Sequence, residues 1–72
     1  MITGETLRFL RIMKGVKQET LAKQLGISQP AYCKLEKKSR IDNERWAQIA
    51  HELNCQEDEL QLLMQFSERS PQ

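Results

Sequence analysis

The chain has 72 residues, of which 39% are hydrophobic, and a formal net charge of +1. This length predicts a single domain, and because so small a chain buries only about 60% of its unfolded surface, a partner subunit would add stability. No apolar run approaches the roughly 20 residues of a membrane span and the first residues contain no signal-peptide core, which predicts a cytoplasmic protein.

Residues that carry enzyme or metal chemistry are sparse. Cys33 and Cys55 lack the spacing of a metal-binding pair, and the single histidine, His51, completes no credible ligand set. The sequence contains no phosphate-binding glycine loop, no paired-carboxylate signature and no nucleophile motif. We therefore expect no enzyme activity, no metal, no cofactor and no pocket for a small-molecule effector.

Charge is unevenly distributed along the chain. Residues 1–40 contain nine basic and three acidic side chains, a net charge of +6, whereas residues 41–72 contain two basic and seven acidic ones, a net charge of −5. Ordinary solvated helix faces are one explanation of this split. The other is a basic half that attracts nucleic acid and an acidic half that is repelled by it, so that docking is oriented.

The spacing of apolar residues predicts five helices, without repeats or low-complexity linkers. The first covers about residues 5–14, where Thr3 is placed to cap its start and Gly15 to end it in a left-handed conformation. The second covers about residues 18–25. Because lysine is a poor N-cap, Lys17 predicts a frayed start for this helix.

The third predicted helix covers about residues 29–38 and has two faces. Ser28 is one candidate for its N-cap. Gln29 is the other, because the residue before a proline is pushed away from the helical region and Pro30 would then take the first helical position. One face holds Ala31, Tyr32, Leu35 and Glu36, and the other holds Gln29, Pro30, Cys33, Lys34 and Lys37. The first face can pack on the domain, while the second offers amide and ammonium donors to a DNA groove.

Asp42 predicts the N-cap of a fourth helix, in which Trp46, Ile49 and Leu53 have core spacing, and Asn54 follows where Asn tolerates a left-handed conformation. The fifth helix covers about residues 57–66, and its acidic first turn suits the positive end of the helix dipole. These boundaries predict one domain over residues 1–66 and a flexible tail over residues 67–72.

The segment from Gln18 to Leu35 has a spacing typical of two helices that cross closely. Apolar residues lie at inward positions, Ala22 leaves room for the crossing and Gly26 supplies the turn. The segment resembles the helix-turn-helix of the phage-repressor-like (Cro/C1, or Xre) family of DNA-binding domains, and the resemblance runs from about Thr3 to about Leu63. It implies an all-α, lambda-repressor-like bundle of five helices, in which the second and third form the helix-turn-helix.

The resemblance also implies which residues touch DNA: Gln18, Ser28, Gln29, Pro30, Cys33, Lys34, Lys37, Lys38 and Arg40. Gln18 matches the position that binds a phosphate and braces the first base-reading side chain, and Gln29 matches that base-reading position. A glutamine amide there pairs with N6 and N7 of adenine, a pattern unique to that base in the major groove. Lys34 would donate to guanine or to a phosphate.

Other members of this set would have supporting roles. Ser28 would touch the DNA backbone, Pro30 would contact a thymine methyl group and Cys33 would face the groove. The three basic residues among positions 37–40 match phosphate-contact positions. The family often has Asn-Gly where this chain has Lys37 and Lys38, so either the turn after the third helix differs from the family's or that helix extends.

Arg11 and Glu36 match a family ion pair that ties the first helix to the end of the third. We expect a partly buried, bidentate pair that orients the reading helix. Two solvated charges are the alternative, and such pairs contribute little to stability.

The resemblance predicts a repressor-like transcriptional regulator that binds a near-palindromic site in double-stranded DNA as a homodimer, with its recognition helices about 34 Å apart. Leu62, Met64 and Phe66 are the best candidates for the dimer interface, and core packing is the alternative for Leu62 and Phe66. The alternative function is a protein-interaction module, such as an antitoxin-like protein whose acidic residues 57–59 engage a basic partner.

Overall fold

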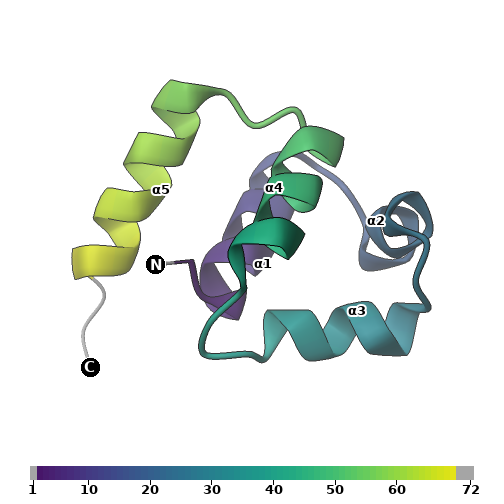
Figure 1. Ribbon diagram of the computed structural model, residues 1–72. Coiled ribbons are helices and arrows are strands. Elements are labelled where there is room, and N and C mark those ends of the chain that lie inside the picture. The colour runs from purple at the N-terminus through teal and green to yellow at the C-terminus, as the bar shows by residue number, and fades with distance from the viewer. Residues whose placement is uncertain (1, 70–72) are drawn as a thin grey trace.

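The computed structural model describes residues 2–69, and within this range it gives every side chain except those of Met64 and residues 66–69. The described residues form five helices and no strand, as predicted (Figure 1). In chain order the helices are α1 (Gly4–Met13), α2 (Gln18–Leu25), α3 (Gln29–Glu36), α4 (Asn43–Glu52) and α5 (Glu57–Arg69).

The core lies where α1, α2, α3 and α4 meet. Leu7 and Leu10 of α1, Leu21 of α2, Tyr32 of α3 and Ile49 of α4 have no exposed surface. Helix α5 packs against α1, to which it adds the buried Leu63, and it stands on the side of α1 away from α2 (Figure 1). The spacing of apolar residues therefore predicted the inward positions of Tyr32 and Ile49 correctly.

Three turns have left-handed backbone at the predicted residues. Gly15, Gly26 and Asn54 have φ angles of 71°, 74° and 52°. A β-carbon added at Gly26 would meet no atom within 4 Å, so the need for glycine there is conformational and not a matter of space. Asn54 follows Leu53 at the end of α4, and Asp42 caps the start of that helix, as predicted.

Helix α3 ends two residues earlier than predicted, at Glu36 and not at Lys38. The reason is a tertiary contact with the start of α1. The amide of Gly4 donates to the carbonyl of Lys38 at 2.8 Å, and the amide of Ile41 donates to the carbonyl of Ile2 at 2.8 Å. A β-carbon at Gly4 would lie closer than 3.0 Å to backbone atoms of Leu35 and Glu36, so the close packing of α1 on the end of α3 requires glycine.

Two further boundaries differ from the prediction. Helix α1 covers Gly4–Met13, one residue earlier at each end than predicted. Helix α5 continues to Arg69, so the first three residues of the predicted tail are helical, while residues 70–72 lie outside the described residues. Among the described residues, no helix is long and apolar enough to cross a membrane.

Candidate nucleic-acid interface

Helices α2 and α3 pack against each other, and Ala22 of α2 is 2% exposed. The carbonyl of Ala22 accepts the amide of Ile27 at 3.0 Å, and Gly26 turns the chain between the two helices. Lys17 makes no side-chain cap at the start of α2, as its poor capping ability predicts. The small side chain and the left-handed glycine together set the angle at which α3 leaves α2.

Ser28 caps α3, because its Oγ accepts the amide of Ala31 at 3.2 Å. Gln29 is thus the first helical residue and Pro30 the second, and the alternative in which Gln29 itself is the cap is wrong. Pro30 fits because the first amides of a helix have no partner within the helix, so the missing N–H costs nothing there. Gln29 is held in helical geometry despite the proline that follows it.

The two faces of α3 differ in burial. Tyr32 is fully buried and Glu36 is 8% exposed, so both point into the domain. Cys33 is half-buried, and the remaining candidate contacts on or beside this helix are exposed: Ser28, Gln29, Pro30, Lys34, Lys37, Lys38 and Arg40. Ala31, predicted on the packed face, is also exposed, because the domain contacts only the narrow stripe of α3 around Tyr32.

The inner end of α3 is held by a hydrogen-bond network centred on Glu36. The Nε of Arg11 donates to Glu36 Oε2 at 2.6 Å, and the side chains of this pair are 11% and 4% exposed. The Tyr32 hydroxyl donates to the same oxygen at 2.6 Å, and the side-chain amide of Gln18 donates to Oε1 at 2.8 Å. Arg11 also donates to the carbonyl of Val16 at 2.8 Å. Glu36 therefore connects α1, α2 and α3 in one place.

The network keeps Glu36 ionised. Burial opposes the charge, but the hydrogen bonds from Arg11, Tyr32 and Gln18 outweigh it and hold the pKa of Glu36 below its usual value. Burial and the hydrogen bond to Glu36 raise the pKa of the Tyr32 hydroxyl, which therefore keeps its proton as the donor. A charged carboxylate with charge-assisted bonds fixes the orientation of α3 more strongly than neutral contacts would.

The sequence predicted the pair of Arg11 and Glu36 but missed Tyr32 as a donor. A signal was available, because residues four apart share a helix face and Tyr32 precedes Glu36 by four. In this structure the side-chain amide of Gln18 donates a hydrogen bond to Glu36. The bracing of Gln29 by Gln18 stays a prediction about the DNA complex.

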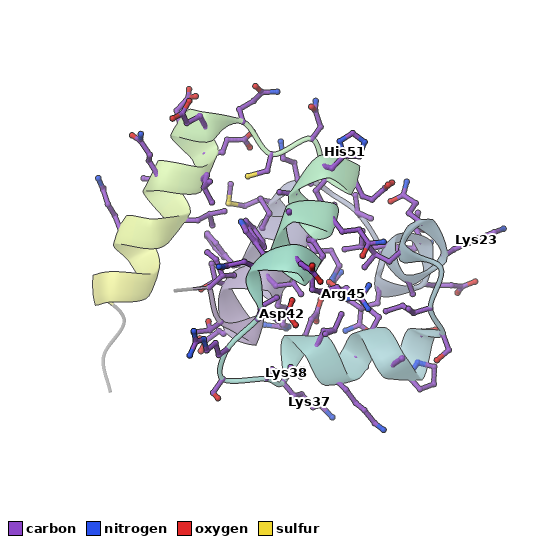
Figure 2. The ribbon with its side chains drawn as sticks, in the orientation of Figure 1. Lys23, Lys37, Lys38, Asp42, Arg45 and His51 are labelled. Carbon is purple, nitrogen blue, oxygen red and sulfur yellow. The ribbon has the colours of Figure 1, made fainter. Side chains whose placement is uncertain are left out.

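Basic side chains follow α3 at the edge of the domain. Figure 2 shows Lys37 and Lys38 at the C-terminal end of α3, and Asp42 and Arg45 at the start of α4. Asp42 Oδ1 accepts the amide of Arg45 at 2.8 Å, so this carboxylate is committed to the cap. A shallow cavity of about 280 Å³ lies in this loop, lined by Lys38, Arg40, Ile41, Asp42 and Asn43. Two cations thus border a recess at the exit of α3.

Comparison with protein families gives a match to the helix-turn-helix family over residues 7–60. This chain belongs to that family, in its Cro/C1 type. The helix-turn-helix match covers all but the first residues of α1, the whole of α2, α3 and α4, and the first turn of α5. Comparisons with curated proteins and with solved structures found no significant match.

Membership of this helix-turn-helix family makes the protein a DNA-binding regulator. Its α2 and α3 are the two helices that define the motif. Within the described residues, no group of three or more His, Cys, Asp or Glu side chains is placed to hold a metal ion.

The predicted dimer residues lie beyond the part of the helix-turn-helix protein that the family match covers. Leu62 is 61% exposed, so its alternative role in core packing is wrong. The side chains of Met64 and Phe66 lie outside the described residues.

Proposed function

We propose that this protein is a sequence-specific transcription regulator that occupies an operator in double-stranded DNA, acts as a repressor and binds as a homodimer. The observation that carries the proposal is the asymmetry of α3. Its inner side is held to α1 and α2 through Glu36, and its outer side presents exposed Gln29 and Lys34. A recognition helix needs this combination, because base contacts are specific only when the helix is held in one orientation.

Base reading belongs to the exposed side of α3. Gln29 lies in its first turn, where recognition helices approach the base edges, and its amide matches adenine N6 and N7. Lys34 lies further along the exposed side and donates to guanine O6 or N7. Pro30 contacts a thymine methyl group, and Cys33 lies at the edge of this surface.

Phosphate contacts surround the reading surface. Lys37, Lys38 and Arg40 are exposed at the exit of α3 and supply positive charge to one strand. Gln18 and Ser28, at the starts of α2 and α3, contact the other side of the groove through helix N-terminal groups. The acidic first turn of α5 is repelled by the same phosphates, which favours docking through α3.

A dimer follows from the small size of one reading surface. One recognition helix contacts a few base pairs, and a two-fold dimer doubles the site and places the helices about 34 Å apart on one side of the duplex. The operator is therefore a near-palindrome.

The test is selection of bound duplexes from a randomised pool, followed by fluorescence-anisotropy titration of the winners across salt concentrations. Three basic contacts in each of two protomers predict a log–log salt slope of about −5. Lys37→Ala should reduce the slope by about 2 in the dimer, and Lys34→Ala should relax the preference at one position of each half-site.

Lys23→Ala is the matched control. It removes the same charge from an exposed lysine of α2 that points away from the domain (Figure 2). This variant should leave the salt slope and the site preference unchanged. If neutralising Lys34, Lys37 and Lys38 has no effect on the protein's interactions while neutralising residues 57–59 abolishes them, the chain is a protein-interaction module instead.

A further inference from the structure

The exposed large apolar side chains of the described residues all belong to two helices in contact. Phe9, Ile12 and Met13 of α1 are 41%, 51% and 48% exposed, and Leu62 of α5 is 61% exposed. Single exposed apolar residues are normal on a protein surface, but a contiguous group marks a place where another molecule binds.

The three residues of α1 share one side of the helix. They are spaced by three and four positions, and the opposite side holds the buried Leu7 and Leu10. Five residues of α1 are exposed, and only Glu5 and Arg8 among them are polar. A helix at the surface of a monomer normally presents a polar outer side to water, and α1 does not.

Leu62 continues this surface onto α5. The Nζ of Lys14, at the end of α1, lies 2.8 Å from Glu59 Oε2 at the start of α5, and Figure 1 shows the two helices running in opposite directions. Leu62 is one turn beyond Glu59 and on the same side of α5. It therefore lies near the end of α1, at the border of the contact between the two helices, because its neighbour Leu63 is buried while Leu62 is exposed.

We propose that these four residues, which we call the α1–α5 face, form the surface on which a second copy of this chain docks. DNA binding by the resulting dimer rests on the proposed function. The docking surface itself follows from burial and charge. A two-fold dimer brings one face against itself, so the face must be complementary to its own copy. An apolar centre satisfies this condition.

The charges at the border of the face also suit a second copy. Glu5 and Arg8 carry opposite signs on the same side of α1, so they can pair with their counterparts across a two-fold axis. Two other charged surfaces cannot do so. The exposed side of α3 carries only basic charges and the first turn of α5 carries only acidic ones, and each would repel its own copy.

The size of the molecule is compatible with such an interface. A standard interface buries about 800 Å² per partner, which is about 15% of this chain's 5228 Å² of accessible surface. The apolar residues would supply the water-free centre, and Glu5 and Arg8 the polar rim. Helix α1 contacts α3 through Gly4 and Arg11, on its inner side, so docking on its outer side leaves the exposed surface of α3 free for DNA.

The experiment is sedimentation equilibrium of the full chain and of three variants. Ile12→Glu and Met13→Glu should each raise the dissociation constant of the dimer by about tenfold or more, since a buried negative charge replaces a central apolar contact. Ala47→Glu is the matched control, because it adds the same charge at an exposed position of α4, and it should leave the constant unchanged. Thermal unfolding of each variant checks that the domain still folds.

Amide chemical shifts recorded on dilution locate the interface independently of any substitution. They should change on the outer side of α1 and the start of α5. The proposal is overturned if the wild-type chain stays monomeric up to about 1 mM both free and on a two-half-site duplex, a concentration range in which weak dimers are visible. It is equally overturned if both α1 variants dimerise like the wild type, or if the shifts map to α2 or α4.

Binding to a duplex with one half-site separates this proposal from the proposed function. Ile12→Glu should bind one half-site as tightly as the control Ala47→Glu and should lose affinity only for the full site. Sequence-specific binding by a monomer in every variant would refute the interface and leave the regulator intact. If Ile12→Glu dissociates the dimer but the protein shows no sequence preference on DNA, the proposed regulator is refuted and the interface stands.

Discussion

Removing one partner of the pair between Arg11 and Glu36 should destabilise the protein strongly. The perturbations are Arg11→Met, which keeps the apolar stem of the side chain, and Glu36→Gln, which keeps the shape and an acceptor oxygen for Tyr32 and Gln18. Breaking a fully buried pair costs about 3–5 kcal/mol, because the remaining charge is left without compensation. Arg11 is 11% exposed and keeps its bond to the Val16 carbonyl, which places the expected cost near the lower end, at about 3 kcal/mol.

The double variant should cost less than the sum of the two single ones. Once both charges are gone, no buried charge remains uncompensated, and we expect a coupling energy of about 2 kcal/mol between the two positions. A domain of 72 residues has a total stability of about 4–10 kcal/mol, so these effects are large enough to measure and small enough to leave a folded population.

The assay is a double-mutant cycle by urea denaturation. Trp46 is the single tryptophan and packs against the core while half-buried, so its fluorescence reports the loss of tertiary structure. The unfolding slope must remain equal across the four proteins for the free energies to be compared. A coupling energy within about 0.5 kcal/mol of zero, the range expected for independent sites, would show that the pair does not act as a unit and would refute the reasoning.

Three further predictions concern pH, glycines and the cap of α3. Because the folded-state pKa of Glu36 is lowered, its contribution to stability is present above the ordinary value of 4.5 and is lost as the pH falls through the lowered pKa. The urea midpoint should therefore drop on acidification, and it should drop less in Glu36→Gln. The pKa of Tyr32 is raised, so its contribution is present below the ordinary value of 10.0 and is lost above it; Tyr32→Phe should flatten the alkaline limb of the same titration. Gly26→Ala should lower the free energy of unfolding by about 1–2 kcal/mol in urea, through its left-handed backbone alone. Gly4→Ala should also weaken DNA binding, because its β-carbon would displace the end of α3. Equal DNA affinity in the two variants at matched stability would contradict this. Ser28→Ala should cost about 1 kcal/mol and increase amide exchange in the first turn of α3, and unchanged protection there would show that the cap is unimportant.

The amino-acid sequence was sufficient for features that depend on near neighbours. Gly15, Gly26 and Asn54 mark turns because few residues tolerate left-handed backbone, and Asp42 marks a cap because its oxygen reaches an amide three residues on. The spacing from Gln18 to Leu35 was enough to indicate the family, since both helices and their turn lie within one short segment. Local geometry of this kind is encoded within a few residues of the chain.

Contacts between distant segments were decided only by the tertiary structure. The end of α3 at Glu36 depends on Gly4, more than thirty residues earlier, because no local pattern reveals how closely two backbones approach. The convergence of Gln18, Tyr32 and Arg11 on one carboxylate depends on the packing of three helices. The exposed apolar side of α1 was likewise hidden in the sequence, since an amphipathic pattern identifies which residues share a side but not which side the rest of the chain covers.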